Sequence, residues 1–141
     1  MTLGLWIILS LITKIFLYIG TIGAAGTAIF RTIFPDFTHL ASKRLLGSLL
    51  VVAIGATVIG YALRSATLVN DSSGLIDMEM HLLLWETAVG TSFATRMTGL
   101  GILLLSLLMA RSGSIIAMLI GSAIALWSFT QIGHATDLDT W

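Results

Sequence analysis

The chain of 141 residues contains no cysteine and a single proline. Without thiols it cannot form a disulfide or a thiolate metal site. Charge is also scarce, because Asp, Glu, Lys and Arg make up 10% of the residues against 57% hydrophobic ones. A soluble domain of this size needs a charged surface, which this composition does not supply. The mean hydropathy of +1.01 therefore indicates an integral membrane protein whose surroundings are the lipid bilayer.

The charge balance excludes a second class of function. The formal net charge is zero, and the seven lysines and arginines are scattered along the chain. Nucleic-acid binding depends on clustered cations that neutralise phosphates. We therefore expect no nucleic-acid partner.

Long apolar stretches predict an all-α membrane protein. A helix needs about 20 apolar residues to cross a bilayer. We place four spans at about 15–30, 45–63, 94–110 and 115–132, with the residues before the first span extending it or lying at the interface. The expected fold is a single domain, 1–141, forming a bundle of four transmembrane helices.

Lysine and arginine bias predicts the orientation of this bundle. The first and third loops carry four cations and one acid: Arg31, Lys43, Arg44, Arg111 and Asp36. The second loop and the C-terminal tail carry two cations and six acids: Arg64, Arg96, Asp71, Asp77, Glu79, Glu86, Asp137 and Asp139. Because the more basic side faces the cytoplasm in most membrane proteins, both termini should face outward. The side of Lys14 is ambiguous, so it does not enter this comparison.

Small residues predict where the helices pack closely. The first span carries small residues four positions apart, at Gly20, Ala24 and Ala28, and the fourth carries them at Gly121 and Ala125. The third span has one small residue of this kind, Gly99. Such stripes let helix backbones approach one another in lipid. We expect them to serve packing within the bundle in preference to a homodimer face.

The stretch from Asp77 to Arg96 carries an unusual concentration of polar groups for this chain. Ionisable residues beside membrane spans are costly and therefore mark candidate functional sites. Apolar and acidic residues alternate over its first half. This pattern favours an amphipathic helix at the membrane surface, at about 75–90, between the second and third spans.

Histidine and methionine in this stretch suggest a copper site. Met78 precedes His81 by three residues, so the two share a helix face, together with Asp77. Thioether and imidazole groups suit copper. His134 follows the fourth span and Met97 opens the third, both on the predicted outer side. The predicted metal ligands are therefore His134, His81, Met78 and Met97.

Each of these residues also has an ordinary structural interpretation. A methionine in a membrane helix is commonly an apolar filler, and a lone interfacial histidine commonly forms hydrogen bonds at headgroup level. Arg96 either anchors the end of its helix by snorkelling or pairs with Glu86 or Asp77.

Two short motifs resemble the CopD copper-resistance family. Thr87-Ala-Val-Gly90 is followed by Arg96 at the entry to a leucine-rich span, and Gly133-His134-Ala135 ends the fourth span. The resemblance extends over about residues 12–136 and carries over most directly to Thr87, Gly90, Arg96, Gly133 and His134. It does not cover His81 and the methionines, which come from the copper argument above.

The resemblance implies a multi-pass protein of the bacterial inner membrane, with both termini periplasmic, that takes part in copper uptake or tolerance. It also implies a periplasmic copper-binding partner of the CopC type. Members of the family are commonly twice as long. This chain is therefore similar to a short, four-span version of the N-terminal half of the usual protein.

Three functions remain open from the sequence. The first is copper binding or transfer at the outer face. The second is an accessory subunit of a larger membrane complex or homo-oligomer, which the scarcity of polar groups within the spans favours. The third is a haem-binding electron carrier, which needs two histidines facing each other within the membrane. We expect no enzymatic activity, because no nucleophile, base and orienting group occur together.

Overall fold

The computed structural model describes residues 3–34 and 40–133, which form helices joined by short connections. The elements are α1 (Leu3–Ile33), α2 (Leu40–Val69), the 3₁₀ helix η2 (Ser72–Leu75), α3 (Met78–Trp85), α4 (Ala88–Ser106), α5 (Arg111–Trp127) and α6 (Thr130–Gly133). The prediction of an all-helical protein is confirmed.

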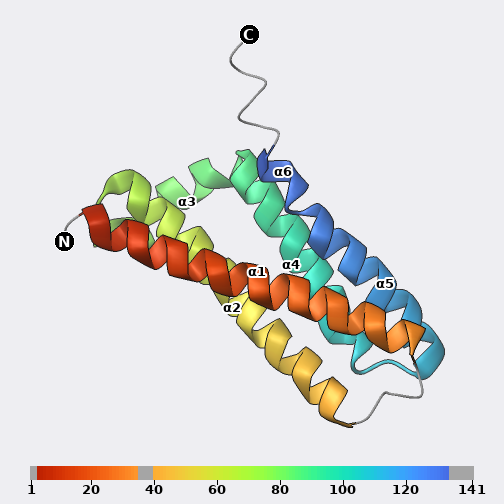
Figure 1. The fold of residues 1–141 in the computed structure, drawn as a ribbon. Helices are drawn as coiled ribbons and strands as arrows, with labels where there is room; N and C mark the ends of the chain where they lie inside the picture. Colours follow the sequence, from red (N-terminus) through yellow and green to blue (C-terminus); the bar gives the residue numbers. More distant parts are fainter. Residues whose placement is uncertain (1–2, 35–39, 134–141) are drawn as a thin grey trace.

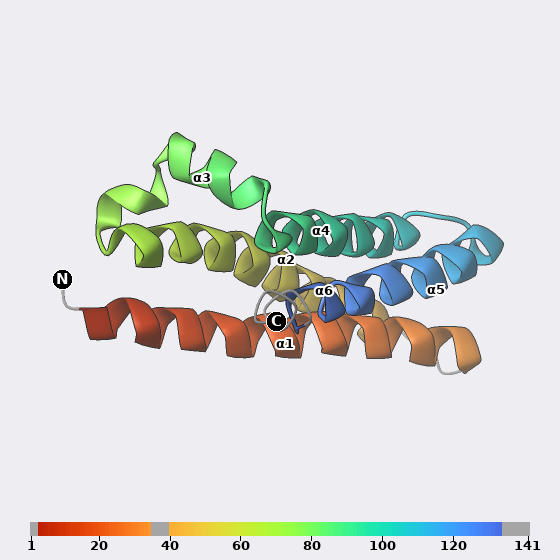
Figure 2. The ribbon, with the colours of Figure 1, turned by 90° about the horizontal axis from the view of Figure 1, so that it is seen from above.

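Four helices form a closed bundle (Figure 1). α1 packs against α2, α2 against α4, α4 against α5, and α5 returns to α1. α1 and α2 are longer than α4 and α5, and they extend beyond them at one end of the bundle. Figure 2 shows η2 and α3 lying beside this extension. α3, which carries His81 and Met78, therefore lies at the end of the bundle where α1 and α2 project beyond α4 and α5.

Three of the helices are long and apolar enough to span a membrane: Gly4–Ile33, Ser42–Val69 and Ala88–Ser106. A fourth apolar helix, Ser112–Trp127, is shorter. At about 1.5 Å per residue it measures roughly 25 Å, a little less than the hydrocarbon thickness of about 30 Å. The first helix is continuous from Leu3, so the residues before position 15 extend it.

The predicted interfacial helix at 75–90 is divided in the structure. Asp77 caps the start of α3 by accepting from the N–H groups of Glu79 and Met80. Thr87 caps α4 in the same way by accepting from Val89. Because capping side chains replace the missing bonds of a helix start, each begins a new helix. The third apolar helix consequently occupies 88–106 and not the predicted 94–110.

Glycines bring the helices into close contact, as the small-residue stripes predict. A Cβ atom at Gly20 would lie 2.7 Å from the backbone nitrogen of Ala53 in α2. A Cβ atom at Gly99 would lie 2.5 Å from the backbone nitrogen of Ala125 in α5. The expected packing within the bundle is confirmed. Around these contacts lie the buried residues Ala24, Ala28, Leu46, Leu50, Leu100, Leu103 and Met118.

Candidate metal site and its supporting arginine

α3 is held beside the bundle by the turn that precedes it. Gly74 of η2 lies against α2 so closely that a Cβ atom there would be 2.9 Å from the carbonyl oxygen of Ser65. Asp71 caps η2 by accepting from the backbone and hydroxyl groups of the serines that follow it. The hydroxyl of Ser73 and these backbone N–H groups lower the pKa of Asp71 below its usual range. This carboxylate is therefore occupied as a cap.

Three contacts fix His81, which lies on α3. Its Nε2 atom donates to the carbonyl oxygen of Leu75 at 3.0 Å. The hydroxyl of Tyr61, in α2, donates to the backbone carbonyl of His81 at 2.7 Å. The two rings also stack, with centroids 5.5 Å apart. Tyr61 is not recognisable as a site residue from the sequence, because it lies 20 positions from His81 in an apolar span.

The contact with Leu75 assigns the tautomer of His81. Because a carbonyl oxygen only accepts hydrogen bonds, Nε2 carries a proton and the Nδ1 atom of the neutral ring carries a lone pair. The Nδ1 atom is buried and has no hydrogen-bond partner among the described residues. A ligating histidine typically has this arrangement, with one nitrogen fixed by a carbonyl and the other available to a metal.

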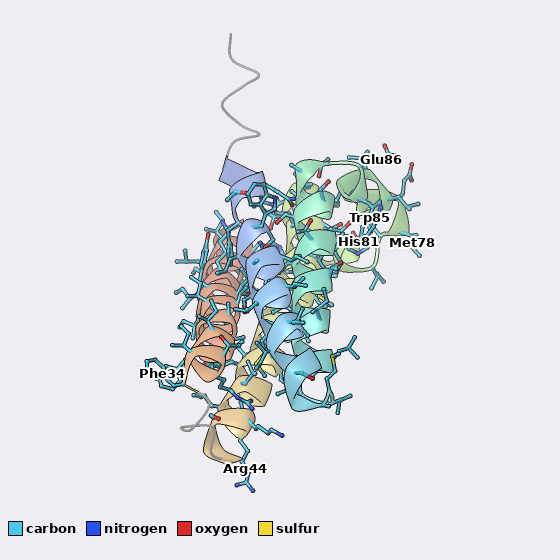
Figure 3. The ribbon with its side chains drawn as sticks, turned by 90° about the vertical axis from the view of Figure 1, so that its right-hand side faces the viewer. Phe34, Arg44, Met78, His81, Trp85 and Glu86 are labelled. Carbon is cyan, nitrogen blue, oxygen red and sulfur yellow. The ribbon has the colours of Figure 1, made fainter. Side chains whose placement is uncertain are left out.

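Of the other predicted ligands, Met78 lies on α3 and Met97 on α4. Met78 lies one turn before His81 on α3, at the end of the bundle opposite Arg44 (Figure 3), and its side chain is 71% exposed. Met97 lies on α4, one turn beyond Phe93, whose ring packs 4.7 Å from that of Tyr61. Asp77 precedes α3, and its Oδ1 atom caps the helix by accepting from the N–H groups of Glu79 and Met80.

The complete predicted ligand set is not assembled within the described part of the chain. There, no three His, Asp or Glu side chains gather into a site that would hold a metal ion. His134 lies outside the described residues, so its distance from His81 is not defined. The ligand set His134, His81, Met78 and Met97 therefore stays a prediction.

Arg96 is buried in the bundle, with 5% of its side chain exposed. Its Nε atom donates to the hydroxyl of Ser128 at 2.9 Å, and its Nη2 atom donates to the hydroxyl of Ser92 at 3.1 Å. The guanidinium also lies over the ring of Phe129, 4.6 Å from the centroid. Arg96 thus ties α4 to the segment that joins α5 to α6.

Both expectations for Arg96 are wrong. It does not snorkel at a helix end, and its described partners are serine hydroxyls and an aromatic ring instead of Glu86 or Asp77. The reason is the early start of α4 at Ala88, which puts Arg96 about two turns inside the helix. At that depth the side chain points into the bundle.

Thr87 and Gly90 form the junction of α3 with α4. The hydroxyl of Thr87 donates to the carbonyl of Leu84 at 2.6 Å and accepts from the N–H of Val89 at 3.2 Å. Gly90 lies against the backbone of Trp85, where a Cβ atom would overlap the carbonyl group. Gly133 is the last residue of α6. Thr87 and Gly90 therefore join α3 to α4, while Arg96 joins α4 to the segment after α5.

Comparison with known proteins identifies one family. The family model described as Copper resistance protein D-like, N-terminal domain matches residues 5–141. The match includes both short motifs and nearly the whole chain. No curated protein and no solved structure matches this sequence.

Proposed function

We propose copper binding or transfer as the function of this chain, which belongs to the copper resistance protein D-like family. Family membership supports a role in copper resistance for a multi-pass membrane protein. The proposal goes further by placing copper, as the cargo, at the end of the bundle where α3 lies. The function is binding or transfer, with no catalytic step.

The free Nδ1 atom of His81 is the observation that carries this proposal. Its lone pair is fixed by the bond from Nε2 to Leu75, and the atom has no partner among the described residues. The thioether of Met78 lies one turn earlier on the same helix. Imidazole and thioether together suit copper. Because Nδ1 is buried, we expect copper to enter with a shift of α3.

Met97 and His134 complete the proposed ligand set. Met97 is half-buried on α4, the helix that follows α3. His134 follows directly after Gly133, the end of α6, and is proposed as the ligand contributed by the C-terminal segment. Figure 2 shows that α3 and α6 both lie on the side of the bundle where α4 begins.

We place this face on the periplasmic side of a bacterial inner membrane. Arg31, Lys43 and Arg44 lie at the opposite end of the bundle, as expected of a cytoplasmic side. A periplasmic copper protein of the CopC type is the proposed partner, and a second membrane subunit or another copy is the proposed source of the remaining transport path. Among the described residues His81 is the one histidine, so no observation favours haem.

Copper titration of the purified full chain tests the ligand role of His81. His81→Gln keeps a donor near the position of Nε2 but removes the Nδ1 lone pair, whereas His81→Ala removes both. We expect both variants, and Met78→Leu to a smaller degree, to weaken Cu(I) binding by about tenfold or more in competition with a chromogenic chelator. The Cu(I) affinity of Met97→Leu tests whether the thioether on α4 is also a ligand.

Met109→Leu is the matched control, because Met109 is an exposed methionine in the connection from α4 to α5. It should bind copper like the wild type. Unchanged Cu(I) affinity in His81→Gln and His81→Ala would overturn the proposed site. Helix content measured by circular dichroism shows whether each variant is folded.

A further inference from the structure

A cavity of about 280 Å³ lies between α1, α2, α4 and Phe129. Its described lining includes three cations, Lys14, Arg64 and Arg96, and no aspartate or glutamate. α1, α2 and α4 thus each contribute one positive charge. In the sequence Lys14 stands out because it is the single charged residue between positions 3 and 30.

These cations are not neutralised within the described part of the chain. Arg96 is bound by serine hydroxyls, and neither Lys14 nor Arg64 has a described hydrogen bond or acidic partner. Charges inside membrane spans are costly and are retained where they serve a ligand or pathway. A cleft lined by charges of one sign also concentrates counter-ions from the surroundings.

The remaining lining supplies donors and apolar walls. Ser10, Thr13 and Tyr18 supply hydroxyl groups to the lining, whereas the hydroxyl of Tyr61, another lining residue, already donates to the backbone carbonyl of His81. Tyr18 stacks on Phe129 with centroids 5.0 Å apart, and Phe129 in turn lies beneath Arg96. The site therefore combines positive charge and hydroxyl donors with aromatic surface, which suits an anionic group attached to an apolar body.

We infer that this cavity binds a phosphate or carboxylate anion, supplied either by the headgroup of an anionic lipid or by a free anion. Its volume is near the lower end of small-molecule pockets, of about 300 Å³ upward, and so fits a headgroup or small anion. The same charges repel a copper cation. Tyr61 lies between the cavity and His81, but none of the proposed copper ligands belongs to the cavity lining.

Binding of defined anions to the delipidated full chain tests this inference. Phosphatidylglycerol and phosphatidylcholine are compared by native mass spectrometry, and inorganic phosphate by equilibrium dialysis. The double variant Lys14→Gln/Arg64→Gln removes two cavity cations. The matched control, Lys43→Gln/Arg44→Gln, removes two exposed cations from the far end of α2.

We expect one anion per chain, bound at least tenfold more weakly by the cavity variant and unchanged in the control. Selective retention of phosphatidylglycerol identifies a lipid headgroup, and equal binding of inorganic phosphate identifies a free anion. In the wild type, binding should also weaken as salt is raised, because salt screens the charges. This last measurement needs no variant and so does not depend on the folding of one.

Three results would overturn the inference. The first is equal binding by the wild type, the cavity variant and the control. The second is equal retention of phosphatidylcholine and phosphatidylglycerol together with no binding of phosphate. The third concerns Asp137 and Asp139, which lie outside the described part of the chain. If added anions bind only to the variant Asp137→Asn/Asp139→Asn, the carboxylates of these two residues occupy the cavity in the wild type.

Discussion

Arg96 is the residue on which the framework of the site most depends. It bonds Ser92 on its own helix and Ser128 beyond α5, and it lies over Phe129. A planar guanidinium satisfies these partners together, whereas an ammonium group offers no such fork. Hydrogen bonds to charged groups contribute about 1.5–3 kcal/mol each.

We therefore predict that Arg96→Lys lowers the free energy of unfolding by about 2 kcal/mol, which is roughly the loss of one such bond. The measurement is denaturation of the purified chain in mixed micelles, followed by circular dichroism. Arg44→Lys, at an exposed position, should unfold within about 0.5 kcal/mol of the wild type. Arg96→Lys with wild-type stability would contradict the bonding described here.

The partners of Arg96 also show how far a sequence predicts a site. Ser92 lies four positions before it, one helical turn away, and belongs to the set of neighbours that helical spacing indicates. Ser128 lies 32 positions after it and becomes a neighbour only when α4 and α5 fold into a hairpin. Likewise, the position of His81 near lipid is predictable, but its stack on Tyr61 is not.

At the scale of elements, α4 and α5 are held together by backbone contact. Gly99 lies directly against α5, with its Cβ position 2.5 Å from the backbone nitrogen of Ala125. Gly101, two residues further on the same helix, has no atom within 4 Å of its Cβ position. Substitution of Gly99 by alanine therefore changes both helix packing and helix propensity, whereas the same substitution at Gly101 changes helix propensity alone.

We predict that Gly99→Ala lowers the free energy of unfolding by about 1–3 kcal/mol, because the added methyl group pushes the backbones apart. Gly101→Ala should leave it unchanged or raise it by up to about 1 kcal/mol through better helix propensity. Unfolding in mixed micelles measures both variants. Equal stabilities would show that α4 and α5 do not pack through Gly99.

Helix boundaries were less predictable than helix contacts. The amphipathic pattern of 75–90 shows no break at Glu86, so it predicts one helix. In the structure α3 ends at Trp85 and α4 begins at Ala88. The capping side chains of Asp77 and Thr87 are the local signals for two starts. The small-residue stripes, by contrast, depend only on spacing within one helix, and that spacing holds wherever the helix begins.

At the scale of the whole molecule, unequal helix lengths create the functional end. α1 has 31 residues and α4 has 19, so the two pairs of helices cannot end together on both sides. The extension of α1 and α2 leaves space for the cationic cavity, and α3 lies beside it. Lys14, Arg64 and Arg96 all line this cavity. Because these three cations line a cavity of the bundle, the predicted orientation depends on the cations at the other end, Arg31, Lys43 and Arg44.

The absence of cysteine makes this orientation directly testable, because any introduced cysteine is the single thiol in the chain. Glu79 on α3 and Lys43 in the first turn of α2 are both exposed and lie at opposite ends of the bundle. With α3 on the periplasmic side, a membrane-impermeant maleimide should label Glu79→Cys in intact cells. It should label Lys43→Cys only after the inner membrane is permeabilised.

The reverse labelling pattern would place α3 in the cytoplasm. A periplasmic partner of the CopC type would then be unable to reach His81, and copper would have to be exchanged on the cytoplasmic side. Labelling of both positions in intact cells would show that α2, the long helix between them, does not cross the membrane. The chain's lack of thiols thus allows one experiment to decide which compartment the proposed copper face serves.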